Sequence, residues 1–220
     1  LMIQTQVQSL LSIPVRTNNA VVGFLDFEAI KNTKTWRDDH RQILEVLVNI
    51  LADALTKVAA EKEINHMAFY DALTGLPNRL LFRDRLEEAI HFARRTNTLI
   101  GVFFIDLDSF KAVNDSFSHE AGDELLKQVA GRLSGCVRKH DTVARFGGDE
   151  FLIMLTNITR AEDISKIAEK VIKSFEQPIF IKETELSVTA SAGIAIFPID
   201  GEESGELIKN ADIAMYSSKA

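Results

Sequence analysis

The sequence has one cysteine, no long apolar run and a deficit of basic residues, and each of these features excludes a class of protein. Its single cysteine, Cys136, rules out a disulfide within the chain and fits a reducing compartment. No apolar run approaches the roughly 20 residues of a membrane span. No signal peptide is visible either, so we expect a cytoplasmic protein with no membrane segment in this chain. The 25 Lys and Arg residues are outnumbered by 32 Asp and Glu residues, and the net charge of −7 argues against a general binder of DNA, RNA or membrane surfaces. An anionic ligand would therefore need a local basic site or a metal ion.

The composition is otherwise that of an ordinary globular protein. Of the 220 residues, 46% are hydrophobic and 26% are charged, which allows one domain or two small ones. The sequence begins with "LMIQTQVQSLLSIPV" and stops at "YSSKA" without a closing element. We therefore expect a piece of a longer protein that is cut at both ends.

The first part of the chain, residues 1–66, reads as a hairpin followed by a long helix. Residues 8–30 hold two apolar runs around the turn-forming "RTNN", which predicts a β-hairpin. Thr35 is the expected N-cap of the helix, with Asp38 as its capping partner. Apolar positions along the helix suit either pairing with another helix or packing on its own sheet, and both remain open: Leu44, Leu47, Leu51, Ala54 and Val58. The polar "AAEKEINH" then reads as a connector into a second domain, residues 67–220.

The second part predicts an α+β fold with a mainly antiparallel sheet. The turn "TGLPNR" precedes a helix from about Leu80 to Arg95, and "TLIGVFFIDL" reads as a buried strand. Helices are also expected at "HEAGDELLKQVAGRLSGCV", "RAEDISKIAEKVIKSF" and "SGELIKNADIAMYSSKA". "TVARF" and "FLIML" are strands joined by a glycine turn, and "IFIKETELSVTASAGIAIF" reads as a hairpin or a bulged pair of strands.

Acidic residues mark the end of the buried strand and the glycine turn. Asp106 ends the strand and Asp108 follows on the same face, so both acids could share one ligand. If the two strands around "GGDEF" lie beside "TLIGVFFI", Asp149 converges on Asp106. Converging carboxylates need a cation, and Mg²⁺ commonly sits between one or two carboxylates and a nucleotide's phosphates. The glycines would let a bulky ligand approach the backbone. The alternative is a hairpin turn with solvated acids.

Four blocks resemble a known family. "DALTGLPNR", "FFIDLDSFKAVNDSFSHEAGDELL", "ARFGGDEF" and "NADIAMYSSK" closely resemble, in that order, the GGDEF family of diguanylate cyclases, over roughly residues 67–220. The resemblance implies a sheet wrapped by helices, similar to nucleotidyl cyclases and polymerase palms. It also implies a reaction that joins two GTP molecules into cyclic di-GMP and releases pyrophosphate.

The resemblance also implies roles for individual acidic residues. Asp106, Asp149 and the backbone carbonyl of Leu107 are expected to hold Mg²⁺, with Mn²⁺ as the alternative ion. Asp149 is in addition the expected base for the attacking 3′-hydroxyl, and Glu150 is the second acid of the signature. Because one domain binds one GTP, the reaction needs a homodimer, for which the long helix is the expected pairing element.

Other matched positions would recognise the nucleotide. Asn114 and Asp123, with His119 nearby, are expected to read the guanine edge, which an amide and a carboxylate can meet and adenine cannot offer. Lys111 and Lys219 match lysines that contact the phosphates.

Arg138 and Asp141 form an RxxD motif, which in the family marks a site where the product cyclic di-GMP inhibits the enzyme. Its alternative is a charged surface loop.

Two features depart from the family pattern. The usual glycine before the histidine is Ser118, which could cap the following helix but would strain the guanine pocket if a positive φ is needed. The chain also ends before an arginine that contacts phosphate in the family.

These departures keep a second hypothesis open: a non-catalytic GTP-binding module that controls a neighbouring phosphodiesterase domain. The first 60 residues resemble the end of a GAF sensory domain. The forms of "TGLPNR" and "NADIAMYSSK" found here resemble those of GGDEF domains that are followed by an EAL phosphodiesterase domain.

Overall fold

The computed structural model describes residues 7–17, 20–181 and 184–219. The chain divides into two compact units, Leu1–His66 and Met67–Ala220. None of the helices within the described ranges is long and apolar enough to cross a bilayer.

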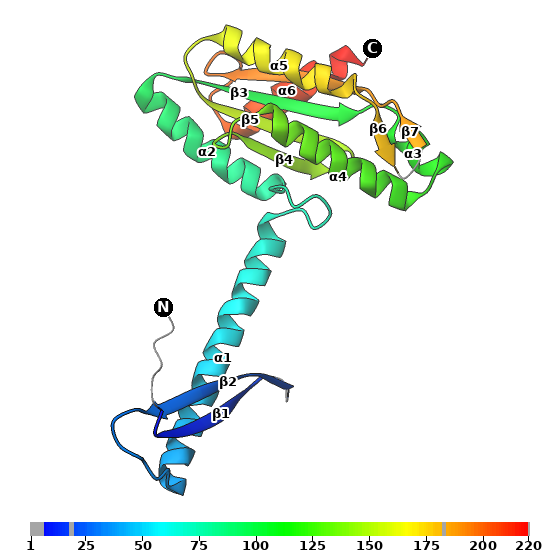
Figure 1. Ribbon diagram of the computed structural model, residues 1–220. Coiled ribbons are helices and arrows are strands. Elements are labelled where there is room, and N and C mark those ends of the chain that lie inside the picture. Colours follow the sequence, from blue (N-terminus) through cyan, green and yellow to red (C-terminus); the bar gives the residue numbers. More distant parts are fainter. Residues whose placement is uncertain (1–6, 18–19, 182–183, 220) are drawn as a thin grey trace. The chain divides into compact units, whose positions relative to one another are not determined.

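The first unit holds a hairpin and most of a long helix (Figure 1). Strands β1 (Ser9–Thr17) and β2 (Ala20–Ala29) pair antiparallel, which confirms the predicted hairpin, although residues 18–19 of its turn lie outside the described residues. Helix α1 (Asp38–Phe69) begins at Asp38, so the prediction that Thr35 caps it is wrong. Asp38 and Asp39 fill the first turn instead, where their charges complement the positive end of the helix dipole.

The apolar stripe expected on α1 is mostly exposed. Among the helix residues of this unit whose burial is described, Val48 and Ala52 are buried, as is Ile13 of β1. Leu47, at 54% exposed, lies outside this core. The stripe is therefore not the face that packs within the first unit, and its pairing with another helix stays a prediction.

The second unit confirms the predicted α+β architecture. Its elements follow in the order α2 (Arg79–Thr96), β3 (Leu99–Leu107), α3 (Phe110–Ser116), α4 (His119–Cys136), β4 (Thr142–Gly147), β5 (Glu150–Ile158), α5 (Ala161–Phe175), β6 (Ile179–Ile181), β7 (Thr184–Leu186), β8 (Ala190–Phe197) and α6 (Ser204–Ser218). Four strands form one antiparallel sheet in the order β4-β5-β3-β8. The short strands β6 and β7 pair only with each other, so the sequence expected to give one bulged pair gives a small hairpin and a separate strand, β8.

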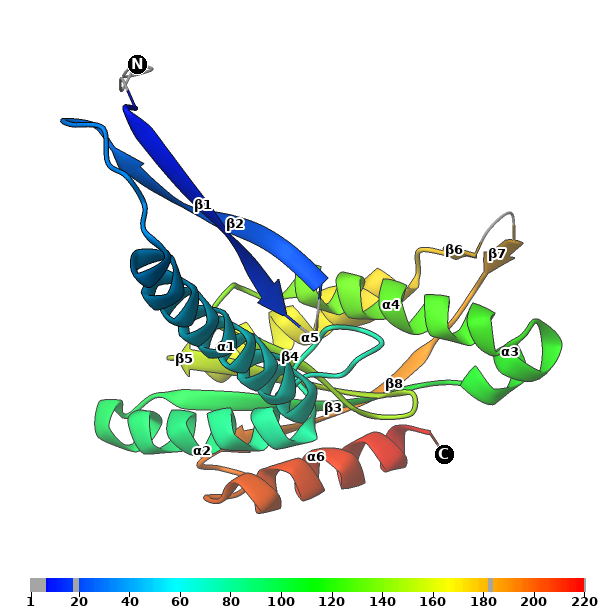
Figure 2. The same ribbon diagram turned by 90° about the horizontal axis from the view of Figure 1, so that it is seen from below.

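Helices cover both faces of the sheet, with α2 and α6 on one side and α4 and α5 on the other (Figures 1 and 2). This explains why β3 is apolar at nearly every position. Phe103, Ile105 and Leu107 join the core that includes α4 and α5. Ile100, Val102 and Phe104 join the core that includes α2 and α6. Because side chains alternate along a strand, Asp106 lies on the same face as Val102 and Phe104.

Helix α6 lies close against β8 because Gly193 has no side chain. A Cβ at that position would lie 2.1 Å from both Ala211 O and Met215 N, which are backbone atoms of α6. The close packing brings the C-terminal end of α6 to the end of β3 that carries Asp106.

Candidate active site

Three strands place Asp106 at the centre of the candidate site. In the antiparallel register, the Cα of Asp106 is opposite Glu150 of β5 on one side and Ser191 of β8 on the other. Residues directly opposite each other in a sheet present their side chains on the same face. The sheet thus brings together two of the predicted acids, Asp106 and Glu150.

The turn between β4 and β5 carries the third acid, Asp149. Its Gly148 has a φ of 51°, a conformation that favours glycine, and a Cβ at Gly147 or Gly148 would meet no protein atom within 4 Å. The Leu107 amide donates to the Asp149 carbonyl at 3.3 Å, which ties the turn to the end of β3. The glycine turn was predicted, and the space beside it is open to a ligand.

The acids of the site repel one another. Burial, and then the charge of Asp106, raises the pKa of Asp149. Burial also raises the pKa of Glu150, followed by the charges of Asp106, Asp149 and Asp212. A raised pKa in a partly buried carboxyl means that its charged form is incompletely compensated by the protein.

Lys219 supplies the one cation that pairs with these acids in the described part of the chain. Its Nζ lies 2.5 Å from Asp106 Oδ1, and the two side chains are 34% and 14% exposed. The hydrogen bond to Asp106 raises the pKa of the Lys219 ammonium. A cation therefore already lies beside Asp106, where its charge also acts on Asp149 and Glu150.

The donors present fit a divalent ion that also contacts a nucleotide. Among the described residues, no three His, Cys, Asp or Glu side chains come together as a group able to hold a metal by themselves. Asp106 and Asp149 offer two carboxylates with open space beside the glycines, and Mg²⁺ is usually held by one or two carboxylates plus phosphates and water.

Asp108, whose spacing suggested a ligand shared with Asp106, is hydrogen-bonded through both carboxylate oxygens. Its two carboxylate oxygens accept hydrogen bonds from the hydroxyls of Thr189 at 2.6 Å and Ser191 at 2.8 Å. These bonds attach the loop after β3 to β8. Asp108 therefore supports the site by fixing the chain next to Asp106, and its charge acts on Lys219 as well.

The residues expected to read guanine lie around the junction of α3 and α4. Asn114 is half-buried near the end of α3, while His119, Asp123 and Lys111, the last expected to contact phosphate, are exposed. A Cβ on the buried Gly122 would lie 2.0 Å from Asn114 Oδ1, so the Asn114 side chain lies directly against the first turns of α4. The seven-residue helix α3 itself was not predicted.

Ser118 is accommodated without strain. Its φ of 166° is extended backbone that any residue adopts, and its hydroxyl accepts a hydrogen bond from the Ala121 amide at 3.3 Å. Ser118 is therefore the N-cap of α4, and the strain expected if glycine were required here is absent.

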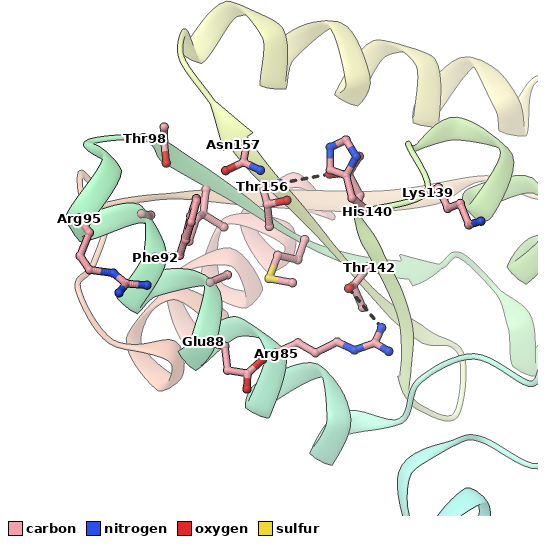
Figure 3. A pocket seen from close by; sticks show the side chains of 15 residues that line it. Arg85, Glu88, Phe92, Arg95, Thr98, Lys139, His140, Thr142, Thr156 and Asn157 are labelled. Atoms are coloured by element: carbon pink, nitrogen blue, oxygen red, sulfur yellow. Dashed lines mark hydrogen bonds and ion pairs between the residues drawn. The ribbon is translucent and has the colours of Figure 1, made fainter.

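The RxxD motif forms a closed turn. Asp141 has a side chain only 4% exposed, and its carboxylate accepts from the Arg138 amide at 2.9 Å and the Thr156 amide at 3.2 Å. Arg138 itself is exposed. The turn borders a cavity of about 640 Å³ between α2 and the β4–β5 strands, where Figure 3 shows Lys139 and His140 opposite Arg85 and Arg95.

Residue patterns did not single out two further residues, Arg145 and Asp71. The Arg145 guanidinium bonds both the Asp71 carboxylate and the carbonyl of Gly148 in the glycine turn. Both residues lie inside blocks that carry the family resemblance, Asp71 in "DALTGLPNR" and Arg145 in "ARFGGDEF", but neither pattern assigned them a role.

Comparisons with known proteins agree with this geometry. Residues 68–220 match the family model described as diguanylate cyclase, GGDEF domain, and residues 1–55 match the GAF domain model. The bifunctional diguanylate cyclase/cyclic di-GMP phosphodiesterase MucR of Pseudomonas aeruginosa is 46% identical over 176 residues, covering 80% of this chain and 25% of MucR. The cyclic di-GMP phosphodiesterase NbdA of the same organism is 39% identical over 173 residues, covering 79% of this chain and 22% of NbdA. The chain thus spans about a quarter of the length of these relatives.

Solved structures show the same fold. The GGDEF domain of TpbB (YfiN) from Pseudomonas aeruginosa superposes with a TM-score of 0.67 at 39% identity, covering 68% of this chain and 88% of that one. The coiled coil and GGDEF domain of DgcB from Caulobacter crescentus, solved in complex with c-di-GMP, gives a TM-score of 0.67 at 28% identity, covering 79% and 94%. The pairing of Asp106 with Glu150 beside a glycine turn, in a fold and a sequence shared with these domains, shows that this chain belongs to the diguanylate cyclase GGDEF domain family.

Proposed function

We propose that residues 67–220 are a diguanylate cyclase domain that condenses two GTP molecules into cyclic di-GMP and two pyrophosphates, and that residues 1–66 are the C-terminal part of a GAF-like sensory domain. The observation that carries the proposal is the cluster of Asp106, Asp149 and Glu150 at one end of the sheet, beside a glycine turn with open space and a lysine ammonium. Its three carboxylates repel one another, so bound cations would stabilise them and would in turn bind the phosphates of GTP.

The acids and the turn would perform the chemistry. Asp106, Asp149 and the Leu107 carbonyl would hold Mg²⁺ or Mn²⁺, and the bound ion would polarise the α-phosphate. Asp149 has a raised pKa, which suits it to accept the proton of the attacking 3′-hydroxyl. Each hydroxyl attacks the α-phosphate of the other GTP and displaces one pyrophosphate. Glu150, on the same sheet face as Asp106, adds negative charge that favours a cation at this position.

Nucleotide recognition would fall to the α3–α4 junction and to two lysines. Asn114 and Asp123, with His119 at the edge, would meet the O6, N1–H and N2–H₂ groups of guanine. Lys111 and Lys219 would contact the phosphates as point charges. Lys219 would then exchange Asp106 for a phosphate when GTP binds.

The catalytic unit would be a homodimer, because each domain supplies one GTP. Several large apolar side chains on α1 are exposed, including Ile43 at 61%, Ile50 at 61% and Leu55 at 59%, and they would form the contact between two copies. Sedimentation with and without a GTP analogue tests this, and activity from a strict monomer would contradict it.

The RxxD turn would bind the product as an inhibitor. Since backbone amides already occupy the Asp141 carboxylate, Asp141 would shape the turn and Arg138 would contact the ligand. The related DgcB domain was solved with c-di-GMP bound, which supports such binding here. Arg138→Ala should relieve product inhibition, and unchanged inhibition would refute this role.

A single assay separates the cyclase from the alternative, a non-catalytic GTP-binding module controlling a neighbouring phosphodiesterase. The alternative draws support from relatives named as phosphodiesterases, such as NbdA. The chain is incubated with GTP and Mg²⁺, and cyclic di-GMP is measured by mass spectrometry. Asp149→Asn should reduce turnover about 100-fold or more, as loss of a general base does. The matched control, Asp163→Asn, changes a half-exposed carboxylate of α5 that pairs with Lys166, and it should retain full activity. GTP binding without product would favour the module.

A further inference from the structure

Arg145 joins two segments that are far apart in the sequence. It lies on β4 just before the glycine turn, and its side chain is only 14% exposed. Its Nε and Nη2 donate to the Gly148 carbonyl at 3.0 and 2.7 Å, and its Nη1 lies 3.1 Å from both carboxylate oxygens of Asp71. Its backbone amide donates to the Pro77 carbonyl at 3.0 Å. Arg145 thus bonds the turn that carries Asp149 to the loop at residues 70–78.

Asp71 is held in place from its own side. The amide and hydroxyl of Thr74 donate to Asp71 Oδ1 at 2.8 and 2.6 Å, and the Asp71 amide donates to the Leu76 carbonyl at 2.8 Å. Burial acts to raise the pKa of Asp71, but hydrogen bonds from Thr74 and Arg145 outweigh it and lower that pKa. The carboxylate is therefore a fixed, charged anchor for the Arg145 guanidinium.

Asn78 closes the same loop and joins two helices. Its Nδ2 donates to the Ala68 carbonyl in the last turn of α1 at 2.8 Å. Its Oδ1 accepts from the Leu80 and Leu81 amides at 3.0 and 3.1 Å, which caps α2. The loop that anchors Arg145 is therefore bonded directly to the end of α1.

We propose that Arg145, anchored by Asp71, is a positioning residue that orients the Gly148–Asp149 peptide, so that the end of α1 and the catalytic carboxylate are held by one hydrogen-bonded unit. A planar guanidinium that donates twice to one carbonyl fixes the direction of that carbonyl. The carbonyl belongs to the residue just before Asp149, so its direction sets the backbone from which the Asp149 side chain leaves. The proposal rests on the cyclase function proposed above. Arg145 acts through Asp149 and does not touch the reacting atoms.

The test compares Arg145→Lys with Arg132→Lys. Arg132 of α4 is a suitable control because it is also a half-buried arginine that donates to backbone carbonyls, those of Ser174, Gln177 and Pro178, between the end of α5 and β6. Both changes retain the positive charge and lose the planar fork. Arg145→Lys should lower kcat about 10- to 100-fold, in line with the cost of misplacing a catalytic group by about 1 Å. Its KM for GTP should stay within about threefold, because the guanine and phosphate contacts lie elsewhere. Arg132→Lys should leave kcat unchanged.

A second measurement does not depend on turnover. The Leu107 amide donates to the Asp149 carbonyl, so its hydrogen exchange reports the position of the turn. Arg145→Lys and Asp71→Asn should both speed this exchange, while the Phe103 amide, further back in the same strand, should be unaffected. The double variant should show no more than the larger single effect, because the two residues act as a pair.

The outcomes separate the two proposals. If the parent chain makes no cyclic di-GMP, the proposed function fails, and Leu107 exchange still tests the positioning role. If Arg145→Lys retains both its kcat and its Leu107 exchange, the positioning role is refuted. If both arginine variants lose kcat only in proportion to lost folded protein, Arg145 is merely structural and the positioning role is also refuted.

Discussion

Gly122 offers a sharp test of guanine recognition, because adding one methyl group there perturbs a single proposed contact. The Cβ of Gly122→Ala would lie 2.0 Å from Asn114 Oδ1, 2.9 Å from Asn114 Cγ and 3.1 Å from Phe110 Cζ. An acceptable carbon–oxygen contact is about 3.3 Å or longer. The Asn114 amide oxygen must therefore retreat by more than about 1 Å, which a flexible side chain can do but a guanine contact cannot tolerate.

Gly122→Ala should leave the folded protein as stable as before, or slightly more stable, but should weaken its binding of GTP. Alanine is favoured over glycine within a helix by up to about 1 kcal/mol, so the free energy of unfolding should stay level or rise slightly. A hydrogen-bonding group left unpaired costs about 1–3 kcal/mol, which raises the Kd for GTP about 5- to 150-fold. The preference for GTP over ATP should decrease as the affinity for GTP decreases. Calorimetric titration of both nucleotides and urea unfolding provide the two measurements.

Gly131→Ala is the matched control for Gly122→Ala. Gly131 lies in the same helix, and a Cβ there would meet no atom within 4 Å. It should gain up to about 1 kcal/mol in the free energy of unfolding, with no change in GTP affinity. If Gly122→Ala binds GTP as tightly as Gly131→Ala does, Asn114 does not read the base.

Four further changes test the site and its support. Gly193→Ala should lower the free energy of unfolding by about 1–3 kcal/mol in urea, because its Cβ would meet two backbone atoms of α6 at 2.1 Å. Gly147→Ala should leave urea unfolding unchanged, since its Cβ enters open space, yet lower cyclase turnover because that space is proposed for GTP. Glu150→Gln should raise the Tm of the metal-free protein at neutral pH: the folded-state pKa of Glu150 is raised, so its ionised form destabilises the fold above the unfolded pKa. In thermal scans that advantage should vanish below about pH 4, where the carboxyl is protonated in both states. Lys219→Gln should weaken GTP binding and lower the metal-free Tm, as it leaves Asp106 without its cation.

Much of the sheet and of the acid cluster could be predicted, because each depends on local pattern. The buried strand ending in Asp106 and the glycine hairpin before Glu150 are visible as runs of residues, and antiparallel pairing brings their ends together. The spacing suggested that Asp149 faces Asp106. The register shows that Glu150 is the residue directly opposite, while Asp149 lies one position out, at the turn.

What could not be predicted depends on contacts between distant segments. The bonds from Asp108 to β8, and from Arg145 to Asp71, link residues with no local periodicity in common. Thr35 is not the helix cap because α1 begins three residues later, at Asp38, with two acids in its first turn. The small hairpin of β6 and β7 could not be distinguished from part of β8, because short apolar runs read alike whichever strand they pair with.

Glu150, Asp106 and Ser191 lie opposite one another on three neighbouring strands, and this pairing determines when the site forms during folding. The three residues lie in strands that are distant along the chain, so they meet only after long loops have closed, which is slow compared with helix formation. A slip of one residue in this register would turn Asp106 to the opposite face of the sheet. A nascent or partly unfolded chain therefore has no site at all. If the proposed function is right, such a chain would be inactive and would make no cyclic di-GMP before it is folded.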